Sequence, residues 1–132
     1  MDDLVAWHGE SWESPLWFVF LRGARPNPTL SAWRVRAQAR EHTEATAPTF
    51  VWTVDGGGIV FDTGTVTVPS SGEELDTDSI QLVLTPADWA DKPRDWHGFL
   101  DVEISRGPED APAEVRTIVR NRPFHVEPDT AR

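Results

Sequence analysis

The chain has 132 residues, 39% of them hydrophobic, and a formal net charge of −10 from 22 acidic and 12 basic side chains. A chain of this length forms one domain with its own core, and its acidic balance argues against non-specific nucleic-acid binding. The absence of cysteine excludes disulfides and thiolate metal sites, and the longest apolar run, residues 15–21, is far shorter than the ~20 residues of a membrane span.

The N-terminal third predicts an arm followed by two strands. We expect residues 1–14 to form an N-terminal arm, and their acidic start does not fit the basic start of a secretory leader. Residues 16–22 are apolar up to the final Arg22, which is typical of a strand buried on both faces or covered by a partner. After a proline-rich turn at residues 23–29, residues 32–40 alternate between apolar and polar, which predicts a strand with one solvent-exposed face. The solvent-exposed face would carry Arg34, Arg36, Gln38 and Arg40.

The middle of the chain predicts further short strands. Residues 50–54 and 59–62 flank an Asp-Gly-Gly-Gly turn, which is typical of a hairpin. Residues 65–68 predict another short strand, and residues 70–79 a loop that carries four acids. Residues 80–84 alternate again, so we expect a strand whose leucine and isoleucine side chains point inward.

The last third predicts one helical turn and a closing hairpin. Thr85 at the N-cap, Pro86 at the first helical position and Asp88 at the third favour a turn of helix near residues 85–91. Residues 99–104 and 115–119 alternate on either side of a Gly-Pro-acidic loop, which indicates a hairpin.

Together these elements predict an all-β fold, a single antiparallel β-sandwich of the Ig-like or jelly-roll-like kind with about seven or eight strands. The sandwich would span residues 15–127, with residues 128–132 as a C-terminal tail.

No pattern in the sequence predicts catalysis, a cofactor or a metal. The four histidines, His8, His42, His97 and His125, are far apart, and none has a second ligand at metal spacing. The acidic run at residues 73–78 lacks the order of a calcium loop, so a calcium site there is the lesser alternative to a solvated loop. We therefore expect a protein that is not an enzyme.

Tryptophan and arginine are the residues that suggest a binding surface. Four of the seven tryptophans lie in charged segments, where an exposed ring would mark an interface, and the arginines of residues 34–40 would bind carboxylates of a neighbour or of residues 73–78. The predicted interface residues are Trp7, Trp12, Arg34, Arg36, Arg40, Trp89 and Trp96. The alternative is that the tryptophans stack on sugars, as in β-sandwich carbohydrate-binding modules. The absence of tyrosine favours a protein partner over a sugar.

Several segments together form a family pattern. They are the Trp-His-Gly-Glu motif at residues 7–10, the Trp-Arg-Val-Arg strand at 33–36, the Leu-Thr-x-x-x-Trp motif at 84–89, and the C-terminal motifs at 98–104, 116–118 and 124–132. With these segments the chain resembles the small β-sandwich domains of tailed-phage virions, in particular the N-terminal domain of phage baseplate upper proteins and its short stand-alone relatives.

The resemblance implies a non-enzymatic virion component that attaches to a repeating protein lattice. It could be a capsid decoration or minor capsid protein, or a tail or baseplate adaptor. Its partners would be major capsid protein or tail and baseplate subunits, and it would form a symmetric multimer on the particle, with no nucleic acid and no membrane as partner. Its expected location is the virion, assembled in the host bacterial cytoplasm. A carbohydrate-binding module for host cell-surface glycan is the alternative.

Overall fold

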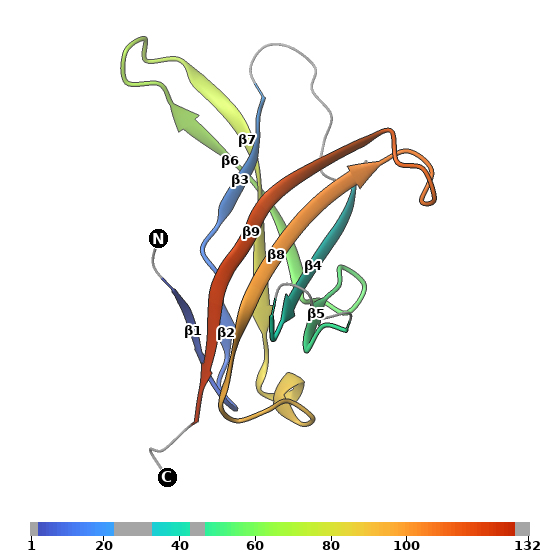
Figure 1. Cartoon of the computed structure of the whole chain (residues 1–132). Coiled ribbons are helices and arrows are strands. Elements are labelled where there is room, and N and C mark those ends of the chain that lie inside the picture. Colours follow the sequence, from blue (N-terminus) through green and yellow to red (C-terminus); the bar gives the residue numbers. More distant parts are fainter. Residues whose placement is uncertain (1–2, 23–32, 43–46, 129–132) are drawn as a thin grey trace.

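The computed structural model describes residues 3–22, 33–42 and 47–128, which form nine strands and one short 3₁₀ helix in two sheets (Figure 1). The elements are β1 (Leu4–Trp7), β2 (Trp12–Glu13), β3 (Trp17–Arg22), β4 (Arg34–Arg40), β5 (Phe50–Trp52), β6 (Ile59–Thr67), β7 (Glu74–Leu84), η2 (Pro86–Trp89), β8 (Trp96–Arg106) and β9 (Glu114–Glu127). The predicted all-β class is confirmed. Within this described part, no helix has the length and apolarity to cross a membrane.

The first sheet has five strands in the order β1-β9-β8-β4-β5. Its centre is the closing hairpin, which the alternating pattern predicted and which extends further than predicted at both ends. Residues Leu100, Val102 and Ile104 of β8 are fully buried, as their alternation with polar residues requires. Both long strands of this hairpin curve along their length (Figure 1).

The second sheet is built around β7. β2 and β3 lie end to end along one side of β7, and β6 pairs with its other side. The inward positions Ile80, Leu82 and Leu84 of β7 are buried, which confirms the predicted alternation. The two long hairpins, β6–β7 and β8–β9, diverge toward the end of the molecule opposite η2 (Figure 1).

Aromatic rings fill the space between the sheets. Phe50 lies at their centre and contacts Trp52, Trp89, Trp96 and Phe124 with ring centroids 5.2–5.9 Å apart. Offset and edge-on contacts at this separation each contribute about 0.5–1.5 kcal/mol beyond the burial of apolar area. These rings come from the first sheet and from η2, and Trp12 of β2 adds a ring from the second sheet against Trp52 and Phe124.

η2 forms where the capping pattern predicted it. The Asp88 carboxylate accepts hydrogen bonds from the Thr85 backbone N–H at 2.7 Å and from the Thr85 hydroxyl at 3.0 Å. These bonds hold the first turn, and they direct the Trp89 ring into the core.

Residues 4–13 differ from the expected arm, because they pair with both sheets. β1 lies parallel to β9, with Leu4 opposite Phe124, and β2 pairs with β7, with Trp12 opposite Leu84. The side chains of Leu4 and Ala6 are buried. The parallel partner of β1 lies more than a hundred residues away, so no local pattern indicates it. Residues 129–132 of the predicted tail, and the predicted turn at 23–29, lie outside the described residues.

The predicted hairpin of residues 50–54 and 59–62 is wrong. The turn itself forms, since Gly57 and Gly58 donate their N–H groups to the carbonyls of Val54 and Thr53 at 3.1 and 3.0 Å. Its two strands then enter different sheets, because β5 pairs with β4 and β6 pairs with β7. The turn is thus a connection between the sheets.

Two further segments differ from the prediction. Most of the acidic run belongs to a strand, since β7 begins at Glu74, and β6 continues through the short strand expected at residues 65–68. Leu16 and Phe18 are exposed, so β3 is not buried on both faces.

Candidate functional site

The outer face of the five-stranded sheet, which points away from the second sheet, carries the predicted arginines. On β4 the side chains of Ala37 and Ala39 are buried against the core, while Arg34 and Arg36 are exposed. The predicted alternation of sides is therefore confirmed, but Gln38 on the outer face is buried and Arg40 is partly buried, so this half of the strand is not open to solvent as predicted. Arg36 lies directly opposite Glu103 of β8, and these two residues belong to the same face.

The same face continues to the edge of the sheet that β1 forms. On β1, Val5 and Trp7 are exposed, and they pair in register with His125 and Glu127 of β9. The Trp7 side chain is 50% exposed. The fold thus places Trp7 on one continuous face with the arginines of β4, although they are far apart in the sequence.

The other three predicted interface tryptophans lie between the sheets. Trp89 and Trp96 are only 2% and 8% exposed, and Trp12 is half-buried against Trp52 and Phe124. The expectation that Trp89 and Trp96 are exposed is wrong. Charged neighbours in the sequence suggested exposure, but a 3₁₀ turn and an alternating strand direct these two rings inward. The interface role stays a prediction for Trp7, for the half-buried Trp12 and for the arginines.

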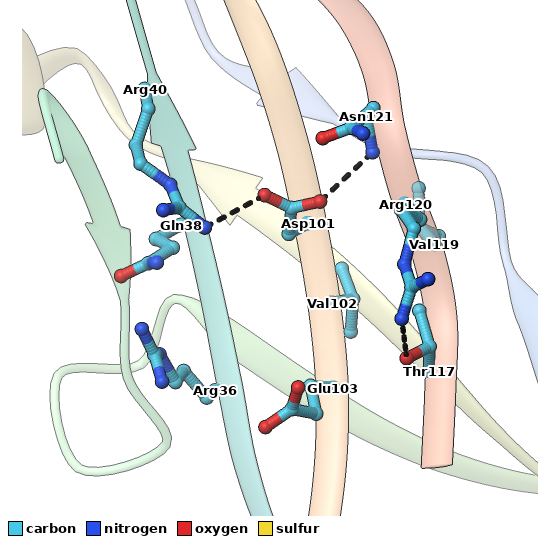
Figure 2. A pocket seen from close by; sticks show the side chains of 10 residues that line it. All are labelled: Arg36, Gln38, Arg40, Asp101, Val102, Glu103, Thr117, Val119, Arg120 and Asn121. Carbon is cyan, nitrogen blue, oxygen red and sulfur yellow. Dashed lines mark hydrogen bonds and ion pairs between the residues drawn. The ribbon is translucent and has the colours of Figure 1, made fainter. Parts of the chain in front are cut away.

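A shallow hollow of about 320 Å³ lies at the centre of the outer face, between β4, β8 and β9 (Figure 2). This volume is at the small end of the ~300–1,000 Å³ range of ligand pockets. Its lining is Arg36, Gln38, Arg40, Asp101, Val102, Glu103, Thr117, Val119, Arg120 and Asn121. Most of these groups are polar or charged, so the hollow suits a polar or charged group of a partner.

Asp101 holds the three strands of the hollow together. One carboxylate oxygen accepts a hydrogen bond from Arg40 of β4 at 3.1 Å, and the other accepts from the backbone N–H of Asn121 at 2.8 Å (Figure 2). Asn121 has a φ of 50°, a left-handed conformation that asparagine tolerates better than most residues. It belongs to a bulge, since Arg120 and Asn121 both lie opposite Asp101 where the register of β9 shifts.

Hydrogen bonds within the chain order the guanidinium groups of the hollow. When the Gln38 carboxamide turns its oxygen toward them, it accepts from Arg36 and Arg40 at 3.1 and 3.2 Å. The Nε of Arg40 is buried and has no hydrogen-bond partner among the described residues. Arg120 donates to the Thr117 hydroxyl at 3.1 Å. Because Asp101 already pairs with Arg40, this arginine does not depend on the acids of residues 73–78.

At one end of this face, charged groups fix the β8–β9 connection. Arg34 donates to the backbone carbonyls of Gly107 and Pro108 at 2.6 and 3.5 Å. Glu114 accepts from Arg116 at 2.8 Å, and this hydrogen bond holds the pKa of the Glu114 carboxyl below its ordinary value. Arg34 thus holds this connection and does not line the hollow, whereas Arg36 and Arg40 do, which makes these two the stronger candidates for a partner.

A histidine pair on this face was missed by the sequence reasoning. His97 and His125 lie opposite each other on β8 and β9, with their Nδ1 atoms 2.5 Å apart, and His125 Nε2 contacts the Asp3 carboxylate at 2.8 Å. The two histidines are 28 residues apart in the chain, so only the hairpin register reveals the pair. Within the described ranges, no three His, Asp or Glu side chains are arranged to hold a metal ion.

The outer face therefore carries an exposed tryptophan on its edge strand β1 and an ordered pair of arginines in a polar hollow at its centre. Such an arrangement can bind a carboxylate-bearing surface. In comparisons with known proteins, no family model matches the sequence, and no curated protein or solved structure is significantly similar to it.

Proposed function

We propose that this protein is a non-enzymatic structural component of a tailed-phage virion, a β-sandwich accessory that attaches to a repeating protein lattice. Its outer face on β1, β9, β8, β4 and β5 binds the neighbouring virion protein. The resemblance described above supports the virion assignment, and the geometry of the outer face supports a protein partner.

The observation that carries the proposal is that Trp7, Arg36 and Arg40 share one face. Tryptophan and arginine are the residues that most often dominate the binding energy of protein interfaces. Asp101 and Gln38 order the Arg40 guanidinium before any partner binds, so less side-chain entropy is lost on binding. An acidic side chain of the lattice protein can then enter the hollow and accept hydrogen bonds from Arg36 and Arg40.

A carbohydrate-binding module is the second candidate, and the polar lining of the hollow favours it, because amides and carboxylates such as Gln38, Asn121 and Glu103 hydrogen-bond sugar hydroxyls. Stacking argues against it. Of the four tryptophans predicted to lie at the interface, Trp89 and Trp96 are buried and Trp12 is half-buried. Trp7 alone among these four presents a largely open ring. On this alternative the isolated protein binds host cell-wall polysaccharide saturably, and Trp7→Ala abolishes the binding.

The proposed function is tested on particles of the phage that encodes this chain. Gradient-purified particles should contain the protein in a fixed molar ratio to the major capsid or tail protein, measured by quantitative mass spectrometry. Substituting Trp7→Ala together with Arg36→Glu should lower that ratio about tenfold or more, because each residue is a hot-spot candidate.

The matched control is Phe18→Ala, which truncates an exposed aromatic on the second sheet and should leave the ratio unchanged. Circular dichroism and thermal unfolding establish that both variants are folded. Point substitutions are preferable to deletion of residues 1–13, which would remove β1 and β2 from the sheets. Absence of the protein from particles, or an unchanged ratio in the Trp7/Arg36 variant, contradicts the proposal.

A further inference from the structure

β6 forms an edge of the second sheet that no other described strand covers. It pairs with β7 along all nine of its residues without a register shift, and none of the described strands pairs with its other side. Natural edge strands are usually protected by lysine, proline, a bulge or short length. The sequence of β6, IVFDTGTVT, has no proline and only one charge, Asp62. β6 is therefore long, regular and open to pairing.

The hydrogen bonds to β7 determine which residues face the open edge. The Val83 N–H donates to the Gly58 carbonyl at 2.9 Å, and the Val68 N–H donates to the Glu73 carbonyl at 2.8 Å. Backbone direction alternates along an antiparallel ladder, so the even-numbered residues of β6 bond to β7. The odd-numbered residues direct their N–H and C=O groups outward; they are Ile59, Phe61, Thr63, Thr65 and Thr67.

Apolar side chains border the same edge. Val60 and Val66 are 43% and 37% exposed on the outer side of the second sheet, and Phe61 is exposed on its other side. Val54, in the turn that leads into β6, is exposed as well and lines a groove with Phe61. An added strand would cover these side chains while it pairs with the free backbone groups.

We propose that the occupant is a second copy of this chain, with the two β6 strands antiparallel about a two-fold axis at the backbone of Thr63. The two second sheets then form one continuous sheet. In this register Val60 lies opposite Val66 of the second copy on one side of the sheet, and Phe61 lies opposite Thr65 on the other. The pairing is self-complementary, as a two-fold interface requires.

The single charge of β6 selects this register. A continuous sheet requires even-numbered residues to pair with even-numbered ones, because a shift by one residue would turn the outer side chains inward. An axis at Asp62 would place two carboxylates directly opposite each other, which is destabilising. An axis at Gly64 would place Asp62 opposite Val66, whereas the axis at Thr63 places Asp62 opposite glycine.

β6 belongs to the second sheet, so this dimer is independent of the outer face and of the proposed function. Because each copy carries a net charge of −10, two copies repel at long range, and added salt should strengthen the dimer by screening this repulsion.

The experiment measures the dimer dissociation constant of the full chain by sedimentation velocity from micromolar to millimolar protein. Gly64 is the informative position, since it faces Asp62 of the second copy, and a Cβ there would meet only the Thr77 hydroxyl at 3.6 Å. Gly64→Lys should tighten the dimer about two- to thirty-fold, because the two-fold axis creates two opposite-charge pairs. Gly64→Asp should weaken it by a similar factor.

The matched controls are Val115→Lys and Val115→Asp, which change the net charge equally at an exposed position of β9. They should shift the dissociation constant by less than the corresponding Gly64 variants. Hydrogen exchange of the Phe61 and Thr65 amides should slow as the dimer forms. A chain that stays monomeric over the whole range, or a dimer that Gly64 and Val115 variants change alike, overturns the proposal.

Discussion

Asp101 ties the three strands of the hollow together, and Asp101→Ala should lower the free energy of unfolding by about 2–4 kcal/mol. The substitution removes the hydrogen bond to Arg40 and the acceptor of the Asn121 N–H. A hydrogen bond to a charged group contributes about 1.5–3 kcal/mol, and solvent reduces this value here because the Arg40 and Asp101 side chains are 25% and 23% exposed. The strained bulge residue Asn121 would also lose its anchor.

Asp101→Asn separates the contribution of the Asn121 hydrogen bond from that of the Arg40 hydrogen bond. Its amide oxygen can still accept from Asn121, but its NH₂ group faces the Arg40 guanidinium, so we expect a loss of about 1–2 kcal/mol. The control is Glu103→Ala, two residues further along the same face of β8. In the described part of the chain Glu103 makes no hydrogen bond or ion pair, so its loss should cost less than about 0.5 kcal/mol.

Urea unfolding monitored by tryptophan fluorescence measures these differences, provided that the m-values agree. A double-mutant cycle with Arg40→Ala should give a coupling energy of about 0.5–3 kcal/mol. If Asp101→Ala and Glu103→Ala destabilise the protein equally, the bulge does not depend on the Asp101 carboxylate and the prediction is wrong.

Two further predictions concern stability. Gly98→Ala should lower the free energy of unfolding by more than about 3 kcal/mol in the same urea assay, since its Cβ would lie 2.3 Å from the backbone oxygen of Arg40. The control is Gly64→Ala, whose Cβ would have no contact under 3.6 Å, so the free energy of unfolding should change by less than about 1 kcal/mol. The hydrogen bond from Arg116 lowers the Glu114 pKa from its ordinary 4.5, so the resulting stabilisation is present above pH 4.5 and is lost as the pH falls through the folded-state pKa. A carboxyl NMR titration should show this lowered pKa and its return toward 4.5 in Arg116→Ala; an unchanged midpoint would contradict the assignment.

The sequence by itself determined those features whose physical cause is local. The two-residue period of β4 separates Arg36 from Ala37 and Ala39, whatever the neighbouring strands are. The capping pattern of Thr85 and Asp88 places the 3₁₀ turn, because its hydrogen bonds span only three residues. The short connection and alternation of the β8–β9 hairpin made its pairing predictable as well.

Only the tertiary structure decided which strands meet and therefore which side chains share a surface. It placed β5 and β6 in different sheets although a tight turn joins them, and it paired β1 with β9 across almost the whole chain. These long-range pairings bring Trp7 to the face that carries Arg36. Which strands pair depends on the burial of a core that the two sheets share. A sequence pattern of a few residues does not specify such a long-range contact.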